Sequence, residues 1–397
     1  MPPKAPAPER RAAGSRSRPV RGREMSAAQI LPRDGLGVLI AALAAGGHRV
    51  LGPTLRDGTI VYDDIAGMDD LPVGWGEEQA GGRYRLRRRD DAAVFGHTVA
   101  AQSWKRFLHP PVVELWRARR NGAGFEPVPP PEPGPPLALI GVRGCDLAAL
   151  RIQDRVLSAG SHPDPVHAGR SAGLFIVAVN CGTAAATCFC TSQGTGPRAG
   201  TGFDLCLTEL GPDHAGAFLL EVGSVAGESL AEALPLAPAG AAEIAAAEAI
   251  VARTATSITR RMPAEGVRET LLDNLDHPRW DDTAARCLAC GNCTMVCPTC
   301  FCTTVEDSTD LSGEEAIRTR HWASCFTLDF SHVHGGPVRA SGRSRYRQWL
   351  THKLATWHDQ FGSSGCTGCG RCITWCPTGI DLTEEVAALA VPPQEGG

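Results

Sequence analysis

The sequence predicts an α+β multidomain protein, in which an N-terminal α/β domain is followed by a mainly helical, cysteine-rich domain. Two observations support this prediction: a strand–helix–strand pattern lies in the middle of the chain, and cysteines crowd its last third. A length of 397 residues allows two or three domains. The expected divisions are a tail at 1–24, the α/β domain at 25–240, a helical bridge at 241–280 and the cysteine-rich domain at 281–397.

The first 24 residues differ from the rest of the chain in composition. They hold seven Lys or Arg, two Glu and several Pro, with almost no apolar side chains. A stretch without an apolar core is neither a secretory signal nor a folding unit, so we expect a disordered tail or a start placed too early, since Met25 opens the first foldable segment. Elsewhere no apolar run approaches the ~18 residues of a membrane span. A net charge of −4 argues against nucleic acid as a partner.

The predicted α/β domain contains one clear strand–helix–strand unit. Residues 137–142 (LALIGV) and 174–179 (LFIVAV) are short apolar runs typical of buried strands, and residues 145–157 between them have helical spacing of their apolar side chains. A connection of this length favours parallel strands. Cys145 directly follows the first strand and Cys181 the second. Since the carboxyl ends of parallel strands form the ligand-binding edge of open α/β sheets, we expect these two thiols to lie near each other.

Sixteen cysteines are a large number for a chain of this length. In a small secreted protein they would indicate disulfides, but the chain is long and shows no export signal. Clustered cysteines in a reducing compartment are more often metal ligands. We therefore expect a cytoplasmic protein whose cysteines act as thiolates.

Two runs of four cysteines share the spacing C-x2-C-x2-C-x3-C-P. This is the spacing of the bacterial ferredoxin motif for [4Fe–4S] clusters, and thiolates are the soft ligands that such iron prefers. Gly291 and Gly370 would let the backbone turn closely around the inorganic core. Structural zinc is the alternative, but it commonly takes two cysteine pairs separated by a dozen or more residues. The runs comprise Cys287, Cys290, Cys293 and Cys297 before Pro298, and Cys366, Cys369, Cys372 and Cys376 before Pro377.

The fourth cysteine of each run is expected to serve the cluster of the other run. Three cysteines on one tight loop can reach three corners of a cubane, whereas the fourth points elsewhere, as in two-cluster ferredoxins. We therefore predict two [4Fe–4S] sites with crossed ligands. One is made of Cys287, Cys290, Cys293 and Cys376, and the other of Cys366, Cys369, Cys372 and Cys297.

The segments around the two runs are expected to be helical. Residues 225–275 are Ala-rich and would form the bridge, and residues 314–325 and 344–361 between the runs also have a helical pattern. This arrangement resembles the α-helical ferredoxin domain of fumarate reductase-type iron–sulfur subunits. A basic face on the last segment would be solvated or ion-paired, or would alternatively dock an acidic partner subunit. Its residues are Arg343, Arg345, Arg347 and Lys353.

Eight cysteines lie outside the crossed sets. The word TCFC occurs twice, at 187–190 and 299–302. If both predicted strands belong to one sheet, Cys145, Cys181, Cys188 and Cys190 could converge at its carboxyl edge and bind a third cluster. In the competing assignment, Cys188 and Cys190 join Cys300 and Cys302 across the two domains. The Gly-rich loop 194–202 would fold over the first TCFC. Cys206 is interpreted as a buried structural thiol, and Cys300, Cys302 and Cys325 have no assigned role.

Taken together, these motifs resemble one family, which covers the iron–sulfur β subunit of soluble NAD(P)-linked [NiFe] sulfhydrogenases and the corresponding iron–sulfur protein of anaerobic sulfite reductase. The resemblance spans most of residues 90–385. One departure is Gly144, where the family usually has Pro. The resemblance rests on GVRGCDLAALRIQDRV, NCGTAAATCFCTSQGTGPRAGTGFDLCLTEL, CLACGNCTMVCPTCFC and SGCTGCGRCITWCPTGIDLTEE.

The resemblance implies a non-catalytic electron-transfer subunit of an oxidoreductase complex, with no catalytic residues of its own. It would relay electrons between a flavin- and NAD(P)-binding diaphorase partner and a catalytic [NiFe] hydrogenase subunit, or alternatively a sirohaem sulfite reductase. The residues alone also allow two other classes of protein, an iron–sulfur redox sensor and a self-sufficient enzyme with a site-differentiated third cluster. No DNA-binding or effector motif supports the sensor.

Overall fold

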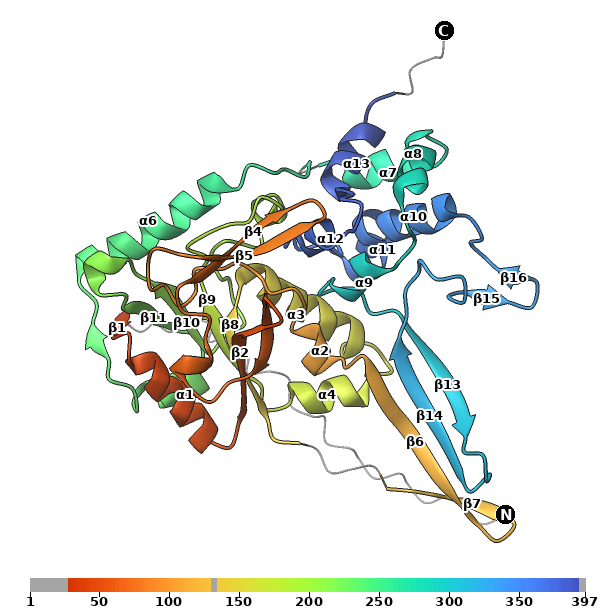
Figure 1. The fold of residues 1–397 in the computed structure, drawn as a ribbon, viewed down its shortest axis with the longest axis horizontal. Helices are drawn as coiled ribbons and strands as arrows, with labels where there is room; N and C mark the ends of the chain where they lie inside the picture. Colours follow the sequence, from red (N-terminus) through yellow and green to blue (C-terminus); the bar gives the residue numbers. More distant parts are fainter. Residues whose placement is uncertain (1–27, 130–133, 264, 393–397) are drawn as a thin grey trace.

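The computed structural model describes residues 28–129, 134–263 and 265–392, so the tail predicted at 1–24 lies outside them. An eight-stranded mixed sheet with the order β12-β1-β11-β10-β9-β8-β2-β3 forms the larger part of the molecule (Figure 1). Its four middle strands are parallel, and antiparallel strands extend both edges. The strands are β1 (Gln29–Leu31), β2 (Arg49–Arg56), β3 (Thr59–Asp64), β8 (Leu137–Val142), β9 (Phe175–Val179), β10 (Leu205–Glu209), β11 (Phe218–Val222) and β12 (Ala237–Pro238).

The strand–helix–strand unit predicted from the sequence is confirmed. Strands β8 and β9 pair in parallel and are joined by α3 (Gly144–Leu157). Every residue of both strands is buried, because side chains alternate between two covered faces. Ala138 and Ile140 belong to the core under α1 (Gly35–Ala45), whereas Leu137 and Leu139 belong to the core under α3. The carboxyl edge of the sheet therefore carries Cys145 in the first turn of α3.

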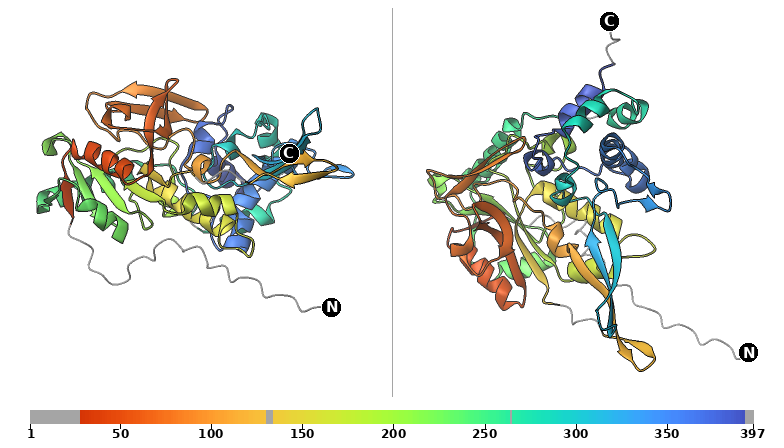
Figure 2. Two further views of the ribbon diagram at one scale, coloured as in Figure 1. Left: turned by 90° about the horizontal axis from the view of Figure 1, so that it is seen from below. Right: turned by 45° about the vertical axis from the view of Figure 1, so that its right-hand side comes forward.

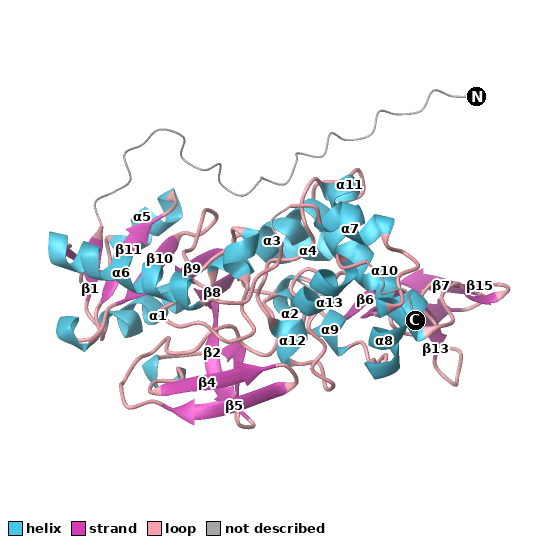
Figure 3. Ribbon diagram, turned by 90° about the horizontal axis from the view of Figure 1, so that it is seen from above, coloured by secondary structure: helices cyan, strands magenta, loops and turns pink. Residues whose placement is uncertain are grey.

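Further helices and one hairpin surround this sheet (Figure 3). Leu230 of α5 joins the α1 core, and Ala247 of α6 packs on Leu219 of β11. The hairpin of β4 and β5 reaches the C-terminal part of the chain, where Gly82 N donates to Ile373 O at 3.1 Å. The elements are β4 (Trp75–Ala80), β5 (Arg83–Arg88), α2 (Lys105–Leu108), α4 (Pro165–Ser171), α5 (Val225–Ala231) and α6 (Ala241–Ser257), with short 3-10 turns at Met68–Asp70, Cys190–Gln193 and Pro212–His214.

A four-stranded antiparallel sheet, which we call the arm, projects from the body (Figures 1 and 2). It pairs β6 (Val112–Asn121) and β7 (Gly124–Pro127) with β13 (Thr303–Thr309) and β14 (Glu315–Trp322). The arm thus takes two strands from the predicted N-terminal domain and two from the predicted C-terminal domain. The two parts of the chain are joined by backbone hydrogen bonds as well as by side chains.

The helical prediction for residues 314–325 is wrong, because most of this segment forms β14. This strand lies between β13 and β6 and pairs along its whole length with both. Its charged residues pair across strands: Arg117 Nη1 lies 2.9 Å from Glu315 Oε2, and Arg318 Nε lies 2.7 Å from Asp307 Oδ1. Pairing with one strand on each side outweighs the local helical tendency of this segment.

The remaining C-terminal chain is mainly helical around an aromatic core that includes Trp280, Tyr346 and Trp349. Phe189 of the first TCFC, fully buried, also belongs to this core. No helix in the described part of the chain is long and apolar enough to span a membrane. The elements are α7 (Val267–Asp273), α8 (Arg279–Arg286), α9 (Asn292–Met295), β15 (His332–Val333), β16 (Gly336–Pro337), α10 (Gly342–Thr351), a π-helical turn (His352–Thr356), α11 (Trp357–Phe361), α12 (Arg371–Thr374) and α13 (Leu382–Leu389).

The predicted basic face on residues 344–361 and its flank is only partly a surface. Arg343 lies 3.6 Å from Asp281, and Arg347 lies 3.6 Å from Asp276, so both are ion-paired as expected. Lys353 does not belong to this face, because it is only 3 % exposed. The π-helical turn that contains Lys353 directs its side chain inward, toward the cysteines.

Candidate iron–sulfur sites

The first cavity lies between the two ferredoxin runs, and we call it the Cys287 cavity. Its empty volume is about 460 Å³, which includes space open to solvent. Three thiols of the first run and Cys376 of the second line it, and Cys372 touches the same space. The lining thiols are Cys287, Cys290, Cys293, Cys372 and Cys376.

Local backbone geometry brings the first-run thiols around this cavity. Helix α8 ends at Arg286, directly before Cys287, and Gly291 then turns the chain with φ of 75° to start α9. A side chain at Gly291 would place its Cβ 3.0 Å from Ser324 Oγ, so only glycine fits this turn without displacing its neighbour. Burial raises the pKa of Cys293 well above its ordinary value, so that thiol ionises readily only when a cation replaces its proton.

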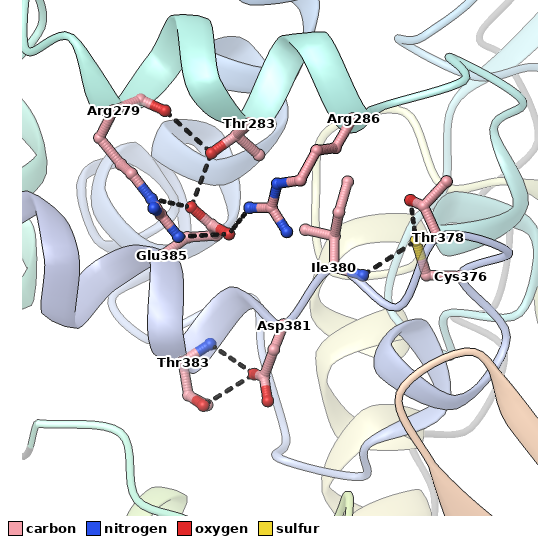
Figure 4. Close-up of polar contacts among 9 residues, drawn as sticks. All are labelled: Arg279, Thr283, Arg286, Cys376, Thr378, Ile380, Asp381, Thr383 and Glu385. Atoms are coloured by element: carbon pink, nitrogen blue, oxygen red, sulfur yellow. Dashed lines mark hydrogen bonds and ion pairs between the residues drawn. The ribbon is translucent and has the colours of Figure 1, made fainter.

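A buried carboxylate joins the helix that precedes Cys287 to the helix that follows Cys376 (Figure 4). Glu385 of α13 is 1 % exposed and accepts from Arg279 Nε at 2.6 Å and from Arg286 Nη2 at 2.5 Å, both on α8. These bonds bind α13, which follows Cys376, to α8, which ends directly before Cys287. The Cys376 sulfur is also held by the backbone, since Ile380 N donates to its Sγ at 3.4 Å.

The second cavity, which we call the Cys366 cavity, has the converse composition. Three thiols of the second run and one thiol of the first surround an empty volume of about 290 Å³. Gly370, with φ of 77°, begins α12 as Gly291 begins α9, so the two runs have the same local backbone. The lining thiols are Cys297, Cys366, Cys369 and Cys372.

Lys353 gives the Cys366 cavity a buried positive charge. Its Nζ donates to Cys297 Sγ at 3.3 Å, to Thr299 Oγ1 at 3.1 Å and to Gly365 O at 3.1 Å. Burial acts to lower the pKa of Lys353, but the neighbouring Cys297 and Cys300 sulfurs outweigh burial and raise it above its ordinary value. A hydrogen bond from Cys300, followed in strength by the Lys353 ammonium, holds the pKa of Cys297 well below that of an ordinary thiol. This cavity therefore favours thiolate at Cys297.

The thiols predicted to form a third site also lie together. Cys145, Cys188 and Cys190 belong to one buried cluster with Cys369, and Cys181 faces Cys145 and Cys190 closely enough to influence their ionisation. We call these four cysteines, without Cys369, the sheet-edge thiols. Burial raises the pKa of all four and brings that of Cys190 to about 12.

Two features suit the sheet-edge thiols to a bound group. The Gly-rich loop folds over them as predicted, and a Cβ at Gly196 would lie 3.0 Å from Cys190 Sγ. Arg143, fully buried, donates from its Nη atoms to backbone carbonyls and also contacts the Cys181 sulfur, whereas its Nε has no hydrogen-bond partner among the described residues. A buried guanidinium beside these thiols would favour an anionic cluster there.

The first TCFC lies directly on the second ferredoxin loop. Phe189 N donates to Gly368 O at 2.9 Å, and a Cβ at Gly368 would lie 2.7 Å from the Cys190 backbone. Thr195 Oγ1 also donates to Thr367 O at 2.6 Å. In the competing assignment, Cys188 and Cys190 would form one site with Cys300 and Cys302. The described residues do not show that arrangement. Cys300 instead contacts Cys297, and Cys302 contacts Cys325.

A buried ion pair joins the sheet edge to the second ferredoxin loop. Arg371, 1 % exposed, donates through Nη1 to Asp146 Oδ1 at 2.8 Å and through Nη2 to Oδ2 at 3.2 Å. Arg371 Nε donates to Ala100 O, and Tyr62 Oη donates to the same carboxylate. Asp146 immediately follows Cys145, and Arg371 immediately precedes Cys372, so the pair joins the chain beside these two cysteines.

Sequence reasoning missed four buried charged residues near these sites: Lys353, Arg371, Glu385, and Lys105, whose Nζ donates to Cys300 O at 3.0 Å. Each is charged and nearly completely buried. Their local sequences look like ordinary polar positions, because each partner lies far away in the chain. The only local signal was at Lys353, which stands beside the apolar residues Leu354 and Ala355 in a helical pattern.

The arrangement of donors differs from that of a structural zinc site. Four donors of a zinc site converge on one ion. Within residues 28–129, 134–263 and 265–392, no three His, Cys, Asp or Glu side chains are grouped closely enough to hold a single ion. The thiols instead surround cavities, as the ligands of a larger inorganic core would. Fold and cavities together define the class of an iron–sulfur dicluster protein.

Comparison with known proteins agrees with this class. Residues 286–380 match the family model described as a 4Fe-4S dicluster domain. The chain is 30% identical over 339 residues to sulfhydrogenase 2 subunit beta of Pyrococcus furiosus, covering 84% of this chain and 90% of that protein. No solved structure matches the chain. The chain therefore belongs to the family of iron–sulfur β subunits that includes this sulfhydrogenase subunit, and iron–sulfur electron transfer is its role.

Proposed function

We propose that this chain is a relay subunit that carries electrons between a flavin- and NAD(P)-binding partner and a catalytic [NiFe] hydrogenase partner. The name of the Pyrococcus relative, a sulfhydrogenase subunit, favours hydrogenase over sulfite reductase as the catalytic partner. In this role the chain binds no substrate, and its residues position the redox centres. Bound [4Fe–4S] clusters would supply the one-electron chemistry.

We assign crossed ligand sets to the two cavities. Cys287, Cys290, Cys293 and Cys376 would hold one cluster, and Cys366, Cys369, Cys372 and Cys297 the other. The sheet-edge thiols Cys145, Cys181, Cys188 and Cys190 would hold a third. What supports this assignment is that each cavity is lined by three thiols of one run and by the fourth thiol of the other, although Cys372 also lines the Cys287 cavity.

The observation that carries the relay proposal is that the three sets of thiols are contiguous. Cys372 touches both the Cys287 cavity and the Cys366 cavity. Cys369 lines the Cys366 cavity and also packs in the cluster formed by the sheet-edge thiols. At the far end, Cys290 and Leu288 are exposed, with Leu288 66 % exposed. An unbroken line of sites that begins at the surface is what an electron relay requires.

Metal analysis of the anaerobically purified chain tests this proposal. We expect about twelve irons with matching acid-labile sulfide if all three sites bind clusters. Cys188→Ser should lose about four of them, whereas Cys206→Ser, which alters a buried thiol of β10 outside the three sets, should lose none. If both the wild type and Cys188→Ser contained about eight irons, the proposal of a third cluster would be contradicted. Fewer than about four irons, with zinc present, would contradict the relay itself.

Lys353→Met tests the electrostatics of the Cys366 cavity. Reduction adds a negative charge, which the Lys353 ammonium stabilises, so its loss should make one cluster harder to reduce. A hydrogen bond to a charged group contributes about 1.5–3 kcal/mol, which corresponds to a shift of roughly 60–130 mV to more negative potential. Potentiometric titration followed by electron paramagnetic resonance measures this shift. Arg347→Met, which removes a partly exposed cation nearby in sequence, should leave all potentials unchanged; an equal shift in both variants would contradict the role of Lys353.

A further inference from the structure

Two of the unassigned cysteines, Cys302 and Cys325, meet where the arm joins the helical part of the molecule. Cys302 immediately precedes β13, and Cys325 follows the end of β14. The ladder continues past the strand ends, because Ala323 N donates to Cys302 O at 2.8 Å. This bond returns the chain toward Cys302, and the Cys302 and Cys325 thiols lie close enough for each to shift the pKa of the other. Both are partly exposed.

A buried lysine, Lys105, lies near this pair of thiols. Lys105 Nζ donates to Cys300 O at 3.0 Å and lies 3.9 Å from the centre of the Trp322 ring. Lys105 is 3 % exposed, so solvent screens its charge little. The same lysine therefore holds the segment that contains Cys302 and places positive charge near its sulfur.

The two thiols are electrostatically unequal. The hydrogen bond from Cys325, followed by the Lys105 and Lys353 charges, lowers the pKa of Cys302 to about 7. The same hydrogen bond, together with burial, raises the pKa of Cys325. In thiol–disulfide exchange, a thiol whose pKa lies near ambient pH attacks a disulfide more readily than a thiol of higher pKa. A neighbouring protonated thiol can then attack the mixed disulfide that forms.

From this juxtaposition we propose that Cys302 and Cys325 form a redox-active thiol pair that undergoes exchange with small-molecule disulfides. Cys302 attacks and Cys325 resolves. The third thiol of this region, Cys300, contacts Cys297 instead, so only two thiols face each other here. Partial exposure at the base of the arm suits a small disulfide better than a disulfide within a folded protein. This activity is separate from the relay and holds whatever the number of clusters.

The exchange is balanced within the reactants. The Cys302 thiolate attacks one sulfur of R–S–S–R, so that a Cys302–S–R bond forms, the S–S bond breaks and RS⁻ leaves. Cys325 then attacks the Cys302 sulfur, which forms the protein disulfide and releases the second RS⁻. The two thiol protons end on the two released thiolates. The protein pair is oxidised by two electrons, and the small disulfide is reduced to two thiols.

Treatment of the anaerobic, cluster-containing protein with glutathione disulfide tests the proposal. After acid quenching and alkylation, peptide mass mapping should show a Cys302–Cys325 disulfide, with these two thiols lost from alkylation. Cys325→Ser should instead accumulate a glutathione adduct on Cys302. Cys302→Ser should lose both the disulfide and any adduct at Cys325. Cys206→Ser, a buried thiol of β10, is the matched control and should behave as the wild type.

Two results would overturn the proposal. Wild-type protein whose Cys302 and Cys325 remain fully alkylated after glutathione disulfide has no reactive pair, and this measurement does not depend on the folding of any variant. A loss of about four irons in Cys302→Ser would make Cys302 a cluster ligand instead of an exchange site. Neither result would affect the iron count that tests the relay, so the two proposals fail independently.

Discussion

Removing Cys297 and Cys287 together is expected to abolish both clusters of the ferredoxin runs, whereas removing Cys297 and Cys366 together should abolish one. Under the crossed assignment, Cys297 and Cys366 belong to the same cluster, so the second alanine substitution adds no further loss. We therefore expect Cys297→Ala/Cys366→Ala to lose about four irons and Cys297→Ala/Cys287→Ala to lose about eight. Iron and sulfide analysis of the anaerobic variants measures both numbers.

The two double variants form a matched test because each removes two thiols. If every run held its own cluster, the results would be reversed, with about eight irons lost from Cys297→Ala/Cys366→Ala. The expected order follows from the lining of the Cys366 cavity, where Cys297 is 8 % exposed and faces the thiols of the other run. The single variant Cys376→Ala should match Cys297→Ala in iron content. Cys376 belongs to the Cys287 cavity, so it serves as the converse control.

The parts of this molecule that could be predicted from sequence are those whose information is local. The apolar runs at 137–142 and 174–179 predicted buried parallel strands because alternate residues must cover both faces of a sheet. The ferredoxin spacing predicted two groups of thiols because three cysteines on one turn are close whatever the rest of the fold does. The crossed sets remain a prediction, and each cavity has the lining that it requires.

The errors occurred where distant pairing decides the structure. Residues 315–322 were expected to be helical, but β6, almost two hundred residues earlier, offers them a strand partner. Lys353 was expected on a basic surface, although its hydrogen-bond partners at Cys297 and Thr299 lie more than fifty residues away. Neither partner can be identified from the local sequence, because the relevant contacts exist only after the two parts of the chain have come together.

The first TCFC shows how the two kinds of information combine. Its repetition suggested a second thiol site, and proximity to Cys145 followed from strand order alone. What the sequence did not reveal is that Phe189 inserts into the helical core while Cys190 packs against the second ferredoxin loop. The segment thus both carries thiols and joins the sheet to the helical part.

Breaking the Asp146–Arg371 pair is expected to cost more stability than any surface substitution. Both side chains are 1 % exposed and joined by two hydrogen bonds, so Arg371→Met would leave the Asp146 carboxylate buried without its counter-charge. Such a change costs about 3–5 kcal/mol. By contrast, Arg347→Met removes a partly exposed ion pair with Asp276 at the surface, which contributes about 0–1 kcal/mol.

Because the pair joins the sheet edge to the loop that carries Cys369 and Cys372, its loss should also weaken the binding of the iron–sulfur clusters. Anaerobic urea titration, followed by the visible absorbance of the iron–sulfur centres, should show an earlier midpoint for Arg371→Met than for Arg347→Met. The double variant Asp146→Asn/Arg371→Met removes both charges and should recover part of the loss, since no buried charge is left unpaired. The contrary result would be a loss of stability in the double variant that equals the sum of the losses in Asp146→Asn and Arg371→Met. The two charges would then not be coupled, and another contact of Arg371, such as that with Ala100 O, would account for its effect.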